Sequence, residues 1–269
     1  GGMEHVTRHL IYSRFWHRFL YDIGEVPVAE PYAKRTAQGL ILGPDGVKMS
    51  KSRGNVVDPN DVVDEYGADV LRVYVLFMGD YEQAAPWSES SLKGCKRFLE
   101  RIWALQDNLT DDEGYSKELS AAFHRTVKKV SADIEQLKFN TAVAAMMTLL
   151  NQIADKGSIT KGELRTLLIL LNPFAPHITE EMYNNIFGGI LSEQSWVTYD
   201  EALCVEETIE IAVQINGKVR AKLNIAADAD QDAMIAAALD NETVKPLVEG
   251  KTIVKKIAVP KKLVNIVVK

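Results

Sequence analysis

The spacing of the apolar residues changes near residue 207, and this change constrains the fold more than any other feature. Before it, apolar residues recur every three or four positions, as in Leu119, Phe123, Val127 and Val130. That spacing predicts helices that pack along one face. From Ile209 onward apolar residues alternate with others, which is the period of a strand. The 269 residues therefore hold at least two domains of different class.

The alternating part predicts a small α+β domain over 208–269. Asn216-Gly217 separates two alternating runs. This dipeptide favours the type I′ turn of a β-hairpin, because both central positions of that turn need a positive φ. The acidic stretch 192–207 is the expected linker into this domain. A helix and two strands are expected to complete it, at 230–239, 252–259 and 263–268.

The segment 85–191 predicts five helices in an antiparallel bundle. The first is expected to start at Ser88, and its apolar face is expected to hold Leu92, Cys95, Leu99, Ile102 and Trp103. A second apolar seam runs from Leu119 to Leu137. Two shorter connector helices are expected within 59–84. Asp58-Pro59 marks the start of the first, because Asp is a good N-cap and Pro suits the first helical position.

The first 58 residues predict one helix ending at Gly24, one strand over 38–42 and a loop over 43–55. One helix and one strand cannot bury a core of their own. This segment is therefore expected to be part of a larger domain that is truncated on its N-terminal side.

Composition excludes several classes of protein. No apolar run approaches the ~20 residues of a membrane span. The two cysteines, Cys95 and Cys204, exclude a disulfide scaffold and fit a reducing cytoplasm. The net charge is −6, yet residues 245–269 hold seven lysines and one glutamate. Such a basic end suggests a polyanionic partner, with an ordinary solvated surface as the alternative.

The loop segment 48–55 carries three cations in six residues, interleaved with hydroxyl residues and followed by Gly54. Lys48 and Lys51 can present ammonium groups to phosphates. Cations fixed beside a leaving pyrophosphate stabilise the transition state more than the ground state. An ordinary basic surface loop is the alternative for an arbitrary pair of lysines at this spacing.

Lys48-Met49-Ser50-Lys51-Ser52 is identical to the signature of class I aminoacyl-tRNA synthetases, and the whole chain resembles the bacterial-type leucyl-tRNA synthetase family. Segments across the chain carry this resemblance, at 1–15, 36–39, 53–59, 66–72, 139–142, 173–181, 213–220 and 262–267. The resemblance implies a multidomain fold. Its parts are a Rossmann-like α/β remnant (1–58), connector helices (59–84), a helical anticodon-binding domain (85–191), the acidic linker and the small α+β domain (208–269).

The resemblance also implies residue roles in ATP and leucine binding. It assigns Lys48 and Lys51 to catalysis at the ATP phosphates. It assigns ATP binding, besides these two lysines, to Met49, Ser50 and Ser52 of the loop. It also assigns ATP binding to three residues outside the loop, Glu4, Gln38 and Gly39. His5 and His9 would line the leucine pocket. Their spacing also suits a zinc pair or plain packing, but no third ligand is visible and no protein-bound metal is expected. ATP would bring its own Mg²⁺.

Basic residues are the expected contacts to tRNA(Leu). Lys93, Arg97 and Arg101 form one helical stripe with Lys96, and a solvated helix face is the alternative for them. In the small domain the candidates are Lys218, Arg220, Lys255, Lys256, Lys261 and Lys262. Because leucine tRNAs differ in anticodon, shape and backbone contacts are expected to outweigh contacts to anticodon bases.

The chain contains no His-x-Gly-His, the second signature of class I enzymes. It is therefore expected to be the C-terminal portion of a leucyl-tRNA synthetase, a monomeric cytoplasmic ligase, and to be inactive alone. Two alternatives remain open. One is a fragment of a valyl- or isoleucyl-type synthetase. The other is a free-standing tRNA-binding protein derived from a synthetase.

Overall fold

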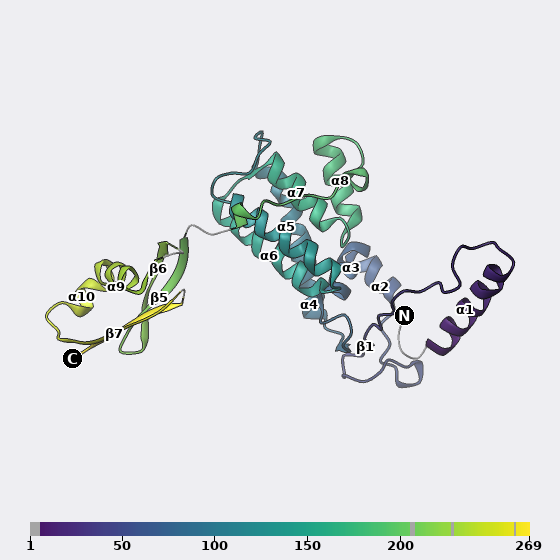
Figure 1. Ribbon diagram of the computed structural model, residues 1–269, viewed down its shortest axis with the longest axis horizontal. Helices are drawn as coiled ribbons and strands as arrows, with labels where there is room; N and C mark the ends of the chain where they lie inside the picture. The colour runs from purple at the N-terminus through teal and green to yellow at the C-terminus, as the bar shows by residue number, and fades with distance from the viewer. Residues whose placement is uncertain (1–5, 205–207, 227–228, 261) are drawn as a thin grey trace. The chain divides into compact units, whose positions relative to one another are not determined.

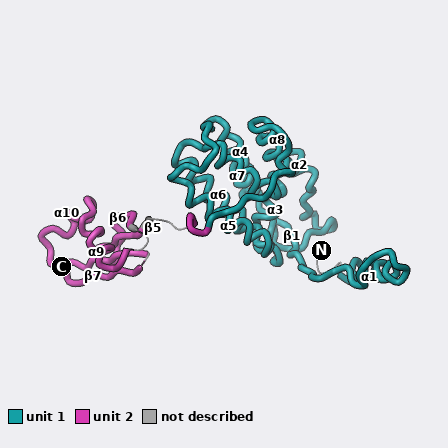
Figure 2. Tube along the Cα trace, turned by 45° about the horizontal axis from the view of Figure 1, so that its top comes forward, with its two compact units in different colours: residues 1–200 teal, residues 201–269 magenta. Residues whose placement is uncertain are grey.

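The computed structural model describes residues 6–204, 208–226, 229–260 and 262–269. It divides into two compact units, residues 1–200 and 201–269 (Figure 2). Glu4, His5 and Lys261, three of the residues named above, lie outside the described part.

The first unit opens with helix α1 (Val6–Asp22), which has no buried residue. The following segment folds back along it. Glu30 pairs with Arg14 at 2.7 Å, and the carbonyl of Val28 lies 2.7 Å from His17 Nε2. Most of the large apolar residues of α1 are exposed, among them Ile11, Tyr12, Phe15 and Trp16. This segment therefore adds no core of its own, as the sequence indicates.

The strand expected over 38–42 is shorter than predicted. Strand β1 (Ile41–Leu42) pairs in parallel with β2 (Ala85–Pro86). Backbone hydrogen bonds extend this pairing, since the N–H of Gly39 donates to Tyr81 O at 2.8 Å and that of Trp87 to Leu42 O at 3.0 Å. The ladder ties the segment that precedes the signature loop to the chain that leaves the connector helices.

The connector helices are α2 (Pro59–Tyr66) and α3 (Ala68–Phe77). Asp58 caps α2 by accepting from Asn60 N–H at 2.9 Å, as the sequence predicts. Val62, Val73 and Tyr74 are buried in the same core as the helices that follow. The connector helices and the larger helical array therefore share one core.

Five further helices form the bulk of this unit (Figure 1). They are α4 (Glu89–Trp103), α5 (Ser120–Glu135), α6 (Phe139–Lys156), α7 (Lys161–Leu171) and α8 (Pro176–Phe187). Between α4 and α5, the short strand β3 (Leu109–Thr110) runs parallel to β4 (Ile159–Thr160). Helix α7 is the central one, since nearly all of its residues are buried. The five helices expected within 85–191 are present.

Two details of the predicted apolar faces are wrong. Trp103 is 44% exposed, because Phe98 joins the buried face of α4 and shifts its centre away from Trp103. The seam expected to run through Leu137 stops at the end of α5. Leu137 lies beyond that helix with a φ of 57°, where it reverses the chain toward α6.

The second unit is a four-stranded sheet with two helices. Its elements are β5 (Thr208–Ile215), β6 (Lys218–Ala226), α9 (Gln231–Asp240), α10 (Lys245–Val248), β7 (Ile253–Val259) and β8 (Leu263–Val268). The strand order is β6-β5-β8-β7, with β5 and β8 parallel. Asn216 (φ 49°) and Gly217 (φ 79°) form the expected turn between β5 and β6. The short helix α10 is not predicted by the sequence.

Alternation along the central strands decides which face of this sheet is covered. Val213, Val264 and Ile266 are fully buried together with Met234 of α9. Figure 1 shows α9 on one side of the sheet. The residues between them, such as Gln214 and Asn265, are only half-buried on the opposite face. The sheet thus has one covered and one open face.

Candidate functional site

The signature loop leaves β1 through a tight turn. The N–H of Gly43 donates to Val47 O at 2.8 Å, and Leu42 forms an antiparallel bridge with Lys48. The two ends of the 43–47 turn are therefore held together by the backbone, and Lys48 leaves the turn at a fixed point.

Asn55 fastens the other end of the loop. Its Oδ1 accepts from Ser50 N–H at 2.9 Å. Its Nδ2 donates to both carboxylate oxygens of Asp45, at 3.2 and 3.1 Å, and lies 3.4 Å from Lys48 O. One amide side chain therefore joins the start, middle and end of the loop. We call Asp45 and Asn55 the loop clasp.

Asp45 is held as an anion within this clasp. A hydrogen bond from Val47 N–H, and then the one from Asn55, lower the pKa of the Asp45 carboxyl. Gly43 leaves the space for it, since a Cβ on Gly43 would lie 2.6 Å from Asp45 Oδ1 and 2.9 Å from Asn55 Nδ2. The loop clasp therefore requires glycine at position 43.

The clasp leaves the two signature lysines at the surface. Lys48 and Lys51 are exposed, whereas Met49 between them is half-buried against the main core and anchors the loop. Lys51 begins a 3-10 turn (Lys51–Arg53) that ends at Gly54, which has a φ of 67°. The Ser50 and Ser52 hydroxyl oxygens lie 2.8 Å apart. This arrangement presents ammonium and hydroxyl groups together, as a phosphate ligand requires.

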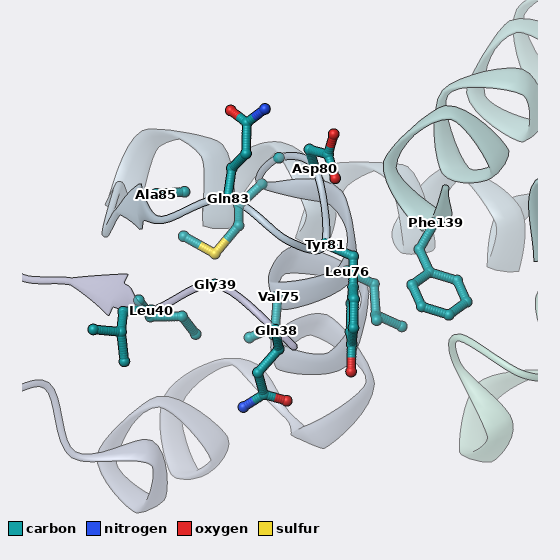
Figure 3. A pocket seen from close by; sticks show the side chains of 13 residues that line it. Gln38, Gly39, Leu40, Val75, Leu76, Asp80, Tyr81, Gln83, Ala85 and Phe139 are labelled. Atoms are coloured by element: carbon teal, nitrogen blue, oxygen red, sulfur yellow. The ribbon is translucent and has the colours of Figure 1, made fainter. Parts of the chain in front are cut away.

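Gln38 and Gly39 border a cavity of about 310 Å³ between β1, the end of α3 and Phe139. Figure 3 shows the Gln38 and Gln83 amides pointing in opposite directions, with the Tyr81 ring toward Phe139. The N–H of Gly39 already donates to Tyr81 O. A Cβ on Gly39 would overlap the backbone of Gln83. This close approach by itself requires glycine at position 39.

His9 is exposed on α1 and contacts Tyr32, whose hydroxyl oxygen lies 3.4 Å from His9 Nε2. In the described part of the chain no group of three or more His, Cys, Asp or Glu residues could hold a metal ion. Within the same residues, no helix has the length and hydropathy needed to cross a bilayer.

The basic stripe of α4 is formed as predicted. Lys93, Arg97 and Arg101 are exposed, and none of them has a carboxylate partner among the described residues. Lys96, beside them, lies 4.0 Å from Glu100 and 5.7 Å from the Tyr66 ring centre. This helix therefore carries three cations available to an anionic ligand.

Two of the candidate cations of the second unit lie on different faces of its sheet. Lys218, Arg220 and Lys262 are exposed near strand ends. Lys255 and Lys256 are neighbours in β7 and so point to opposite faces of the sheet. Lys255 pairs opposite Val267 on the open face, whereas Lys256 pairs opposite the buried Ile266. These two lysines, adjacent in the sequence, are thus separated in the fold.

The sequence by itself assigns no role to the loop clasp. A signal is present, since Gly43-Pro44-Asp45-Gly46 is a typical turn in which an aspartate accepts from the backbone two residues on. Asn55 has no such local signal. Its bonds to Asp45 span ten positions, and only the folded loop brings the two side chains together.

Comparisons with known proteins agree with these features. Residues 12–88 match the family of tRNA synthetases class I (I, L, M and V), and residues 116–235 match the anticodon-binding domain of tRNA ligase. A leucine–tRNA ligase of Alkaliphilus oremlandii (strain OhILAs) is 54% identical over 270 residues, covering 100% of this chain and 34% of that ligase. The chain thus spans about a third of this relative's length.

A solved structure is similar along the same length. It is the crystal structure of a ternary LeuRS–tRNA–LeuAMS complex of Agrobacterium radiobacter K84. The likeness has a TM-score of 0.69 at 33% identity and covers 100% of this chain and 38% of that one. The chain belongs to the class I aminoacyl-tRNA synthetases. Within that class it is part of a leucyl-tRNA synthetase, as its whole-length likeness to such enzymes confirms.

Proposed function

We propose that the intact protein activates leucine with ATP and transfers it to tRNA(Leu), as a monomeric cytoplasmic ligase. The observation that carries this proposal is an intact signature loop within a chain that is 54% identical to a leucine–tRNA ligase throughout. In this proposal 1–58 is part of the nucleotide-binding domain. The helical segment 85–191 and the domain 208–269 bind the tRNA.

Lys48 and Lys51 act on the ATP phosphates. When the leucine carboxylate attacks the α-phosphate, the bond to pyrophosphate breaks and negative charge builds on the leaving group. Two ammonium groups at the loop surface offset that charge, and Ser50 and Ser52 add neutral donors. The loop clasp supports this role because it fixes the ends of the loop and leaves Lys51 exposed. Mg²⁺ enters with the ATP.

The remaining substrate roles rest on the family resemblance. Glu4 holds the ribose hydroxyls, His5 and His9 line the leucine pocket, and Gln38 contacts the adenine. Gly39 has a weaker role in this proposal, because its N–H is already bonded to Tyr81 O. Its contribution to ATP binding is the close packing of its segment against the loop 81–85.

The tRNA-binding role is supported by the exposed cations of α4 and by the lysines of the second unit. Each phosphate neutralised by Lys or Arg releases counterions, so such binding weakens steeply with salt. Lys218, Arg220, Lys255, Lys256, Lys261 and Lys262 are the candidates in the second unit.

The test is equilibrium binding of this 269-residue chain to tRNA(Leu) and tRNA(Val) transcripts at low and moderate salt. We expect tRNA(Leu) to bind more tightly, with a steep salt dependence. Equal and weak binding of both tRNAs would leave the basic residues of α4 and of the second unit without a specific role in tRNA recognition. Separately, we expect the purified chain to form no leucyl-adenylate, because it lacks the His-x-Gly-His signature.

A further inference from the structure

The first lysine of the signature loop is attached to a short backbone ladder. On one side of β1, Lys48 forms an antiparallel bridge with Leu42. On the other side, where β1 runs parallel to β2, the carbonyl of Leu42 accepts from the N–H of Trp87 at 3.0 Å. Leu42 therefore lies between Lys48 and Trp87. A shift of the chain at Trp87 would displace the point from which Lys48 leaves the ladder.

The far side of this ladder is held by Tyr74 of α3. Tyr74 is fully buried, and its hydroxyl oxygen accepts from the N–H of Ser88 at 2.7 Å. Its ring meets the Trp87 ring edge-on, with the ring centres 4.8 Å apart. Ser88 is also the N-cap of α4. Tyr74 therefore fixes the backbone at Ser88 and the side chain at Trp87, directly beside the residue that supports Leu42.

The first turn of the signature loop is not closely packed against this support. Pro44 in that turn and Val57 just beyond the loop border a cavity of about 340 Å³, together with Trp87. Side chains beside an open cavity lack the contacts that fix residues in a close-packed interior. The position of the turn therefore depends on its backbone bonds more than on side-chain packing.

We propose that Tyr74 is a positioning residue for leucine activation, because it holds the ladder that places Lys48 beside the ATP phosphates. This role rests on the function proposed above, in which Lys48 offsets charge on the leaving pyrophosphate. The buried Tyr74 side chain reaches no substrate and acts only through Ser88, Trp87 and Leu42. A displacement of about 1 Å in a catalytic group can lower a rate about 100-fold, so a small shift of the ladder is enough.

The first test measures the ladder itself in the 269-residue chain. Tyr74→Phe keeps the ring and removes only the hydroxyl that accepts from Ser88. Tyr115→Phe is the matched control, since it removes a hydroxyl that lies 2.9 Å from Thr166 Oγ1 in the same helical unit. Amide hydrogen exchange of peptides covering 39–48 and 85–88 is followed by mass spectrometry. We expect it to quicken about fivefold in Tyr74→Phe, the effect of one lost hydrogen bond, and to stay unchanged in Tyr115→Phe.

The second test measures leucine-dependent ATP–pyrophosphate exchange in the full-length ligase. Tyr74→Phe should lower kcat about tenfold and leave KM for leucine unchanged, because the hydroxyl affects only the placement of Lys48. Tyr115→Phe should change neither constant. In a Lys48→Ala background, Tyr74→Phe should cost less than about twofold, since two residues that act through one group are not additive.

The outcomes distinguish this role from the function on which it rests. Unchanged amide exchange in Tyr74→Phe, or equal losses of kcat in Tyr74→Phe and Tyr115→Phe, would overturn the positioning role and leave the proposed function standing. A full tenfold loss in the Lys48→Ala background would also overturn it, because Tyr74 would then act elsewhere. If the unsubstituted full-length protein shows no leucine-dependent exchange, the proposed function fails and the positioning role fails with it.

Discussion

Two segments of the first unit are fastened by polar side chains, and these side chains differ in burial. The signature loop is closed at the surface by Asp45 and Asn55. The segment before α5 is fastened by Glu163, which is fully buried. Glu163 accepts from Ser116 N–H at 2.8 Å, from Thr160 N–H at 3.0 Å and from Lys156 Nζ at 3.2 Å.

This difference in burial distinguishes the structural role of Glu163 from the signature loop, which must adjust to its ligand. A buried carboxylate with several donors cannot move without leaving a charge unpaired. Glu163, at the start of α7, therefore holds the segment before α5 in place. The loop clasp is solvated, and its opening costs little. It can therefore hold Lys48 and Lys51 in place and still let the loop adjust to phosphates. The first four of the following predictions each test one side of this contrast.

The largest effect, on the free energy of unfolding, is expected at the buried Glu163. Glu163→Gln removes the anion and turns an amide N–H₂ toward existing donors. Breaking a buried ion pair costs about 3–5 kcal/mol, so the free energy of unfolding of the first unit should fall by about that amount. Urea unfolding measures it. The matched control is Lys161→Ala, which removes a pair with the exposed Asp111 and should leave the free energy of unfolding almost unchanged, because solvent screens an exposed pair. Equal small losses would contradict the contrast.

Glu163 also predicts a pH dependence. Burial acts to raise the pKa of Glu163, but hydrogen bonds from Ser116 and Thr160 and the contact with Lys156 outweigh it and lower the pKa. The folded-state pKa is thus below the unfolded value of about 4.3. The stabilisation is complete above that pH and is lost as the pH falls through the folded-state pKa. Glu163→Gln should flatten the acid branch of the stability curve; an unchanged branch would reject this role.

The signature loop is tested by Lys51→Ala in the full-length ligase. We expect leucine-dependent ATP–pyrophosphate exchange to fall about 10²–10³-fold, the usual loss for one transition-state donor. The exposed side chain supports no core, so the melting temperature should not change. Lys117→Ala, an exposed lysine outside the loop, is the control. A loss confined to KM for ATP would mean that Lys51 binds the ground state and the transition state equally and adds nothing specific to the transition state.

The clasp itself should give a smaller effect. Asn55→Ala removes the bonds to Asp45 and Ser50, so trypsin should cleave at Lys48 and Lys51 about five- to tenfold faster. Asn55→Asp should be worse, because two carboxylates would face each other. Exchanging the pair, with Asp45→Asn and Asn55→Asp together, should restore slow cleavage. If the exchanged pair cleaves as fast as Asn55→Asp alone, the side chains do not act as a clasp.

Local chemistry explains which elements the sequence could predict. The start of α2 at Asp58-Pro59 and the turn at Asn216-Gly217 depend on residues adjacent in the chain, and both are present. The β3–β4 pairing and the bonds from Ser116 to Glu163 join residues about fifty positions apart. Thr160-x-x-Glu163 is a capping-box pattern, but it predicts only the helix start and says nothing of Ser116.

The features of the candidate site likewise divide into those set by local sequence and those set by tertiary packing. The limits of the signature loop and the basic face of α4 follow from contiguous residues and from helical spacing. The clasp, the overlap that requires Gly39 and the exposure of Trp103 depend on tertiary packing. A helical face is set by all the side chains of the helix, and on α4 Phe98 is buried whereas Trp103 is not.

The smallest effect is expected in the second unit, where neighbouring lysines point to opposite faces of the sheet. Lys255 lies on the open face, and Lys256 pairs opposite the buried Ile266 on the face that α9 covers. If RNA contacts the open face, Lys255→Ala should weaken tRNA(Leu) binding a few-fold and lower the salt slope by about one, whereas Lys256→Ala should have a smaller effect on both. Titration at several salt concentrations measures both. Equal effects would mean that the RNA contacts the edge of β7, where the two side chains are equally near.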